Sequence, residues 1–214
     1  QPRSRGLGDV YKRQGLYWAW KNLDADYIGL VHYRRYFTRK EVRSVEAKKE
    51  QILTGAEWET LLSEYPVVVA DKRKYYIESN RSHYNHAHHS DGLDAAEQII
   101  AEKYPEYSDA FTKVCNRTWA HMFNMFVMRR DLFDQYCEWM FSILEEIEHR
   151  VDISDYDTYE ARIYGFVSEI LLDVWIEANN INYKEQNVSF MEPQNWLKKG
   201  SYFVLRKFGL HSKG

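Results

Sequence analysis

Two short apolar runs, each followed directly by charged side chains, constrain the fold of this chain most. Residues 27–31 read YIGLV and precede HYRR, and residues 66–70 read PVVVA and precede DKRK. Runs of this length with β-branched side chains predict buried strands. In open α/β sheets, ligands bind outside the carboxyl ends of the strands. The sequence therefore predicts an α/β fold with a site among the polar residues that follow the strands. These residues are His32, Arg34, Arg35 and Asp71.

Other segments have the sequence patterns of helices and of one more strand. Helices are expected over residues 16–22, as the end of a helix, and over 55–64, 91–104 and 131–149, from a capping box or the 3.6-residue apolar period. A third strand is expected over 122–128. The highly charged residues 38–51 are expected to form an exposed connection.

The stretch 158–178 predicts a buried helix, because it is apolar nearly all round. Its polar exceptions, Arg162, Glu169 and Asp173, share one stripe of that helix. A buried carboxylate is costly unless it is paired or faces a cavity. Glu169 is therefore either a general base for an acceptor hydroxyl or the partner of a structural ion pair with Arg162.

Arg34 and Arg35 are candidates for binding an anion. A guanidinium group pairs bidentately with phosphate oxygens. A diphosphate that leaves during a transfer reaction develops negative charge, which needs stabilisation. The alternative is a structural ion pair with Asp24 or Asp26, and spacing alone leaves both interpretations open.

Residues 82–89, SHYNHAHH, hold four histidines and are expected to form a loop. Histidine is a frequent metal ligand. However, the spacing lacks the helical i, i+4 pair with a glutamate that marks zinc peptidases. A polar loop with one or two functional residues is favoured, and hydrogen bonding to a ligand stays as open as metal binding. Asn124, inside the expected strand 122–128, needs a partner as well, either a sugar hydroxyl or the backbone.

Composition and charge exclude several classes of protein. The 29 Lys and Arg against 32 Asp and Glu give a net charge of −3, unlike the basic footprint of a nucleic-acid binder. No apolar stretch approaches the roughly 20 residues of a membrane span. Cys115 and Cys137 lack metal spacing and fit a reducing cytoplasm. The basic, aromatic tail 193–214 either lies on an anionic membrane surface or extends into solvent.

Residues 3–14, RSRGLGDVYKRQ, resemble the translation of a transposon-based sequencing adapter. No apolar segment of a secretory signal follows them. We therefore expect residues 1–14 to be a non-native leader. The domain of interest would cover residues 15–192 without its natural beginning, and the tail would follow.

Together these motifs resemble a bacterial family of capsular and exopolysaccharide biosynthesis glycosyltransferases, long known only as a domain of unknown function. The resemblance covers roughly residues 15–192, and its most specific parts are HYRRYF at 32–37 and RIYGFVSE at 162–169. It implies an α/β, GT-A-like nucleotide-diphospho-sugar transferase fold that lacks its first nucleotide-binding βαβ unit. It also implies transfer of a hexose from a nucleotide-sugar to a capsular, exopolysaccharide or lipopolysaccharide acceptor, which can be lipid-linked. The reaction would take place in the cytoplasm or at the inner face of the membrane.

The resemblance also suggests roles for individual residues. Catalysis would involve Glu169 and Arg162; donor binding His32, Arg34, Arg35, Asp71 and Asn124; and sugar or acceptor binding His86, His88 and His89. Related enzymes carry an Asp-x-Asp metal motif where this chain has His32-Tyr33-Arg34, so the arginines would replace the cation, and Mn²⁺ or Mg²⁺ stays an open cofactor. In the family pattern an arginine follows Glu169, but here Ile170 does.

Two alternative functions remain at this stage. A His-rich metal-dependent hydrolase would bind zinc or manganese through His86, His88 and His89. A non-catalytic saccharide-binding or assembly module would bind polysaccharide without affinity for a nucleotide-sugar.

Overall fold

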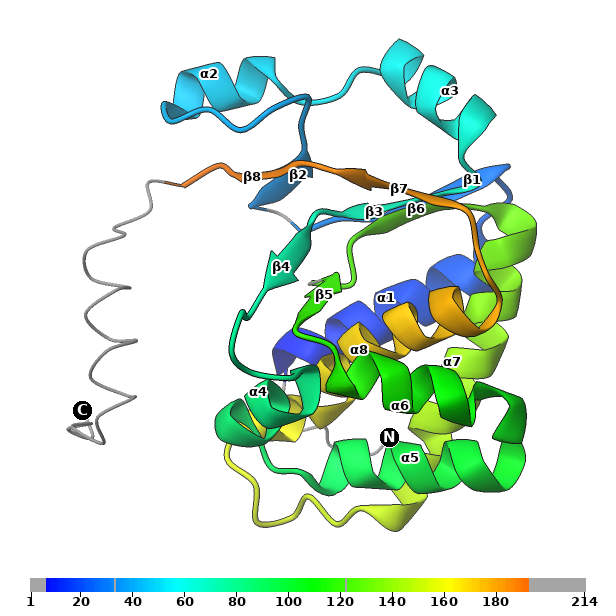
Figure 1. Cartoon of the computed structure of the whole chain (residues 1–214). Coiled ribbons are helices and arrows are strands. Elements are labelled where there is room, and N and C mark those ends of the chain that lie inside the picture. The colour runs from blue at the N-terminus through cyan, green and yellow to red at the C-terminus, as the bar shows by residue number, and fades with distance from the viewer. Residues whose placement is uncertain (1–6, 33, 122, 193–214) are drawn as a thin grey trace, which may run out of the picture.

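A four-stranded mixed sheet forms the centre of the protein in this computed structural model, which describes residues 7–32, 34–121 and 123–192 (Figure 1). Its spatial order is β1 (Tyr27–Leu30), β6 (Phe126–Arg129), β3 (Val67–Ala70) and β7 (Tyr183–Gln186). β6 is antiparallel to β1 and β3, whereas β3 and β7 are parallel. Two small antiparallel sheets pair β2 (Arg35–Phe37) with β8 (Val188–Phe190), and β4 (Lys72–Lys74) with β5 (Trp119–His121).

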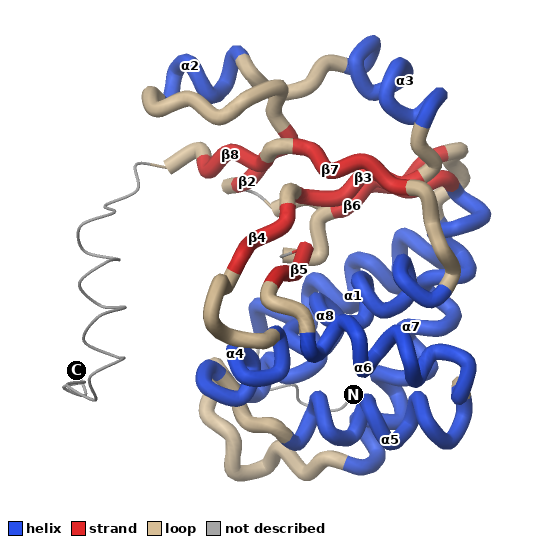
Figure 2. The backbone as a smooth tube through the Cα atoms, viewed as in Figure 1, coloured by secondary structure: helices blue, strands red, loops and turns tan. Residues whose placement is uncertain are grey.

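Helices cover both faces of the sheet, most of them on one side (Figures 1 and 2). On the heavily covered side are α1 (Leu7–Asn22), α4 (Asn80–Ala87), α5 (Asp91–Lys103), α6 (Ser108–Asn116), α7 (Arg130–Arg150) and α8 (Ile163–Ala178). On the opposite side are α2 (Val45–Glu50) and α3 (Gly55–Glu64). Short 3₁₀ turns, η1 (Pro105–Tyr107) and η2 (Glu160–Arg162), precede α6 and α8.

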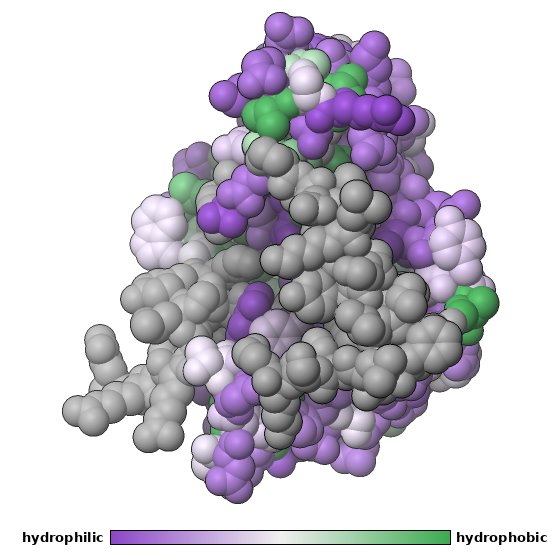
Figure 3. All heavy atoms as spheres, turned by 90° about the vertical axis from the view of Figure 1, so that its left-hand side faces the viewer, coloured by the Kyte–Doolittle hydropathy of each residue, from purple (hydrophilic) through white to green (hydrophobic). Residues whose placement is uncertain are grey.

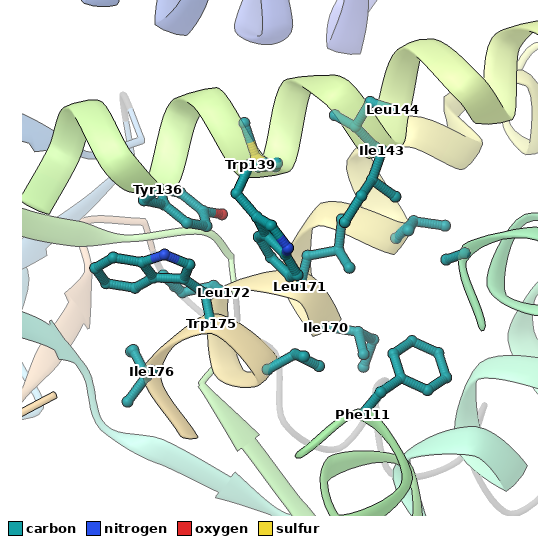
Figure 4. Close-up of a cluster of buried hydrophobic side chains, with 14 of the residues drawn as sticks. Phe111, Tyr136, Trp139, Ile143, Leu144, Ile170, Leu171, Leu172, Trp175 and Ile176 are labelled. Carbon is teal, nitrogen blue, oxygen red and sulfur yellow. The ribbon is translucent and has the colours of Figure 1, made fainter. Parts of the chain in front are cut away.

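Apolar side chains of α7 and α8 form the centre of the core (Figure 4). The 3.6-residue period of α7 directs Tyr136 and Ile143 toward α8, where they pack with Leu171 and Trp175. These side chains are at most 2% exposed, and the rings of Tyr136 and Trp175 lie 5.6 Å apart. Burial of each such side chain contributes about 1.5–3 kcal/mol, so this interface makes a large contribution to the stability of the fold.

Most predicted elements are confirmed. The helices expected over 55–64, 91–104 and 131–149 are α3, α5 and α7, and α1 ends at Asn22 as expected. The glutamate half of the capping box is present, since the Thr54 amide donates to Glu57 Oε2 at 2.8 Å. β3 is buried at all four residues, but β1 lies at an edge of the sheet and buries only Ile28.

In four segments the local structure differs from the expectation. The segment 82–89 is mostly helical, because the Ser79 side chain accepts a hydrogen bond from Ser82 N at 3.1 Å and caps α4. The expected strand 122–128 is interrupted: β5 ends at His121 and β6 begins at Phe126. The helix expected from 158 begins at Ile163, after η2, and the connection 38–51, though largely exposed, contains α2.

Some expectations concern residues at the two ends of the chain. Residues 1–6 of the expected leader and the whole tail 193–214 lie outside the described residues. α1 begins at Leu7, inside the expected leader. In the described part of the chain, no helix combines the length and the apolar character that a membrane span requires. Figure 3 shows a face whose described surface is mostly hydrophilic, with small, separate hydrophobic patches.

A buried ion-pair cluster links α8 to β5. Asp173, 1% exposed, accepts from the backbone amide of His121 at 2.9 Å, and its other oxygen lies 2.5 Å from His121 Nδ1. Arg117 Nη2 also lies 2.5 Å from this carboxylate. Asp173 therefore has a structural role. It does not line the cavity with Arg162 and Glu169, although the sequence pattern placed all three on one stripe of the helix.

Asp173→Ala should lower the free energy of unfolding by about 3–5 kcal/mol, because it removes the nearest counter-charge of Arg117 and the buried hydrogen-bond acceptor of His121. Glu177→Ala, on the same helix but in ion pairs nearer the surface, should cost about 0–1 kcal/mol. Urea unfolding followed by circular dichroism measures both values. Equal costs for the two variants would contradict the structural role of Asp173.

Gly92 lets α5 approach the start of α8. A Cβ atom added there would lie 2.4 Å from Cγ1 and 2.6 Å from Cδ1 of Ile163. Gly92→Ala should therefore destabilise the protein by about 1–3 kcal/mol, despite the higher helix propensity of alanine. Gly55→Ala is the matched control, because no atom lies within 4 Å of its added Cβ. It should be neutral or slightly stabilising in the same unfolding assay, and a tolerated Gly92→Ala would refute the close approach.

Candidate functional site

A cavity of ≈260 Å³ lies at the carboxyl end of β1. Its apolar wall is formed by side chains of α1, β1 and α7, among them Leu16, Leu30, Met140, Phe141 and Leu144. Its polar wall contains four of the residues predicted from sequence, which are His32, Asn124, Arg162 and Glu169. Segments up to 153 residues apart in sequence, from Leu16 to Glu169, thus contribute to one site.

The sheet topology explains why His32 and Asn124 meet. β6 runs antiparallel to β1, with Leu30 opposite Phe126. The start of β6 therefore lies at the edge where β1 ends. His32 Nε2 lies 2.6 Å from the carbonyl oxygen of Phe123, and since a carbonyl only accepts, Nε2 carries the proton. This bond joins the end of β1 to the turn that precedes β6.

The turn before β6 is joined to α8 by a second bond. Phe123 and Asn124 have φ values of 76° and 50°, in the left-handed region that asparagine tolerates better than most residues. Asn124 Nδ2 donates to Ser168 Oγ at 2.7 Å, and Ser168 Oγ donates to the Gly165 carbonyl at 2.8 Å. Sequence reasoning missed Ser168, although it lies within the RIYGFVSE segment.

α8 and the turn before it supply the charged side chains. Glu169 lies on the first turns of α8, next to Ser168, and Arg162 immediately precedes the helix. The Arg162 guanidinium lies 5.4 Å from the Phe166 ring centre and 5.6 Å from that of Tyr159. Contacts of this kind hold a cation over an aromatic face. The cavity therefore combines one guanidinium and one carboxylate, both half-buried.

Tyr75 is a neighbour of Glu169 that sequence reasoning did not identify. Burial raises the pKa of its phenol to about 12; the charge of Arg73 opposes this shift, and those of Glu169 and Asp173 add to it. Its ring also stacks on His83, with centroids 4.1 Å apart. No sequence pattern indicated this contact, because Tyr75 and Glu169 are far apart in the chain.

The arginines after β1 do not line the cavity. The carbonyl of His32 accepts from Arg35 N at 3.1 Å, so the chain turns back here and enters β2. Arg34 forms an ion pair with Glu192 at 2.8 Å rather than with the aspartates considered from sequence. The Arg35 guanidinium lies 3.9 Å from the Phe123 ring centre.

Asp71 also lies outside the cavity lining. It follows β3, and its amide donates to the Gln186 carbonyl at 3.1 Å. Partial burial and the nearby charge of Glu185 raise the pKa of its carboxyl group, while His121 and Lys72 lower it. Its predicted role in donor binding stays a prediction.

The four histidines do not converge. His83 and His86, both on α4, each lie 3.2 Å from an oxygen of Glu78, and these contacts lower the pKa of that carboxyl group. Within residues 7–32, 34–121 and 123–192, no three His, Cys, Asp or Glu side chains form a group that could hold a metal ion.

His88 and His89 contact the connection between α7 and α8. The His88 ring stacks on Phe166, a cavity residue, with centroids 3.6 Å apart and planes 17° apart. The His89 ring stacks on Tyr156 at 4.6 Å, and its amide donates to Glu160 at 3.3 Å. His88 therefore contacts the cavity lining through Phe166, and His89 positions the segment that ends at Arg162.

The pKa of Tyr75 tests the placement of Glu169. At pH 10.5 an ordinary tyrosine, with a pKa of about 10, is largely ionised, but Tyr75 should remain protonated. Glu169→Gln should lower its titration midpoint, because the negative charge that disfavours the phenolate is removed. Carbon-13 NMR of labelled tyrosine Cζ, with Tyr75→Phe for assignment, measures this. An unchanged midpoint would contradict the proximity of the two side chains.

The comparisons with known proteins agree with the fold. A family model described as a domain of unknown function, DUF4422, matches residues 14–180. The apo structure of WbbM, a bifunctional glycosyltransferase, matches 87% of this chain with a TM-score of 0.76 and 27% sequence identity. This chain spans 37% of the WbbM chain. No curated protein matches the sequence. The α/β, GT-A-like glycosyltransferase fold expected from sequence is thereby confirmed.

Proposed function

This chain belongs to the DUF4422 family, and from that premise we propose that it is a glycosyltransferase acting on a nucleotide-sugar and a saccharide acceptor. The observation that carries the proposal is the cavity, where four residues singled out from sequence line one wall. The similarity to a bifunctional glycosyltransferase supports the reaction class. A capsular, exopolysaccharide or lipopolysaccharide acceptor, free or lipid-linked, is the finer part of the proposal.

In the proposed reaction, Glu169 acts as the general base. The acceptor hydroxyl oxygen forms a bond to the anomeric carbon of the hexose, and its proton moves to the Glu169 carboxylate. The bond from that carbon to the diphosphate breaks, and the diphosphate leaves with the electron pair. General base catalysis of this kind contributes about 10²–10⁴-fold in rate.

Arg162 is the guanidinium best placed to stabilise the leaving diphosphate. It lines the same cavity as Glu169, and a fixed positive charge stabilises developing negative charge. The proposal that Arg34 and Arg35 bind the diphosphate is less favoured, because Arg34 pairs with Glu192 and Arg35 lies against an aromatic ring. Mn²⁺ or Mg²⁺ stays an open cofactor of the proposal, and the proposed steps concern the side chains of this chain alone.

We propose the cytoplasm as the place of reaction. Cys115 and Cys137 are buried free thiols, which fits a reducing compartment. Contact of the basic tail 193–214 with the inner face of the membrane is a further part of the proposal and rests on its sequence alone.

Glu169→Gln should reduce sugar transfer by about 10²–10⁴-fold while leaving the fold intact. Glu177→Gln, two turns further along α8 and outside the cavity, is the matched control and should retain activity. The assay follows release of nucleoside diphosphate from nucleotide-sugars in the presence of saccharide acceptors. Normal turnover by Glu169→Gln would refute the role of this residue. Saccharide binding without affinity for any nucleotide-sugar would favour a non-catalytic binding module.

A further inference from the structure

The amide oxygen of Asn124 is an acceptor that the protein leaves open. Oδ1 is shielded from solvent, and no described residue donates a hydrogen bond to it. Buried polar atoms nearly always have a partner, because an unsatisfied one costs free energy. Asn124 and Glu169 line the same cavity, so a ligand hydroxyl in the cavity can supply this partner once the side chains that cover Oδ1 shift.

The surrounding hydrogen bonds fix which amide atom is the oxygen. Ser168 Oγ has one proton, and it donates that proton to the Gly165 carbonyl, which only accepts. Ser168 must therefore accept from Asn124, so the Asn124 nitrogen faces Ser168. The other amide atom of Asn124 is therefore the oxygen, which can only accept a hydrogen bond. The site thus selects for a group that donates a hydrogen bond.

Arg162 and Tyr164 line the cavity and carry donor groups, but neither donates to Oδ1. Leu30, Met140 and Leu144 are hydrocarbon or thioether side chains, and the Nε2 proton of His32 is committed to the Phe123 carbonyl. The apolar wall suits the C–H face of a sugar ring, and the hydroxyl groups of the sugar suit an acceptor in the polar wall.

We infer that this cavity binds a sugar ring through one hydroxyl group that donates to Asn124 Oδ1, with the apolar face of the ring against the side chains of α7 and β1. The inference rests on the proposed function and deepens it. Asn124 is the specificity-determining residue, because an analogue without that hydroxyl leaves Oδ1 unsatisfied. Ser168 is a positioning residue that holds the amide in the productive orientation.

The test compares the binding of parent sugars with that of singly deoxygenated analogues. The 214-residue chain is titrated by calorimetry with UDP-glucose, UDP-galactose, their methyl glycosides and each monodeoxy analogue. The wild-type chain should bind one analogue about tenfold or more weakly than its parent. The nucleotide-sugars and the methyl glycosides distinguish a donor sugar from an acceptor sugar.

Three variants separate specificity from general disruption. Asn124→Ala should bind that parent and analogue within about threefold of each other, whereas Asn124→Asp, which keeps an acceptor, should retain the preference. Ser168→Ala should weaken the preference, because the amide can then rotate. Asn179→Ala, whose side chain contacts Tyr107 far along α8, is the control and should match the wild type.

The outcomes distinguish this inference from the proposed function. If Asn124→Ala keeps the full preference while the wild type binds sugars, the inference is wrong and the proposed function stands. If the wild type binds none of the nucleotide-sugars or glycosides, both are overturned. If Asn124→Ala does not fold, loss of the preference in Ser168→Ala supports the inference and its retention contradicts it.

Discussion

A carboxylate buried in an otherwise apolar helix holds the candidate site together. Asp173 binds both the backbone and the ring of His121, and Arg117 neutralises its charge. Burying such a charge is tolerable only with these partners. His121 lies three residues before Asn124, and Asp173 lies four residues after Glu169. The same ion pair therefore fixes the two sides of the cavity relative to each other, and the Asn124–Ser168 hydrogen bond closes them nearer the ligand space.

Local pattern was sufficient to predict the elements of the core. VVVA at 67–70 is a fully buried strand, and the segment 131–149 with its 3.6-residue period is α7, whose apolar face packs on α8. The apolar pattern gave a wrong prediction where a helix cap or an unusual backbone conformation determines the secondary structure. α4 forms because Ser79 caps it, and the strand expected over 122–128 breaks at a left-handed turn. Neither effect changes the apolar periodicity from which the elements were predicted.

The site was predictable in part, for a topological reason. Residues beyond a strand end were expected to gather at one edge of the sheet, and the cavity does contain His32. Asn124, which was expected inside a strand, reaches the cavity from the turn before β6. The same rule misplaced Arg34 and Arg35, because the chain reverses at His32 and continues as β2, which pairs with β8. The partners of Asn124 are set by contacts between distant segments, which the spacing of residues does not reveal.

We propose that the sugar binds between the turn before β6 and the first turns of α8. A crystal structure of the chain soaked with a nucleotide-sugar tests it most directly. We expect electron density for the hexose in the cavity, within hydrogen-bonding distance of Asn124 Oδ1 and beside the Glu169 carboxylate. Density at the exposed surface near Arg34, Asp71 or His86, with the cavity unchanged, would contradict it.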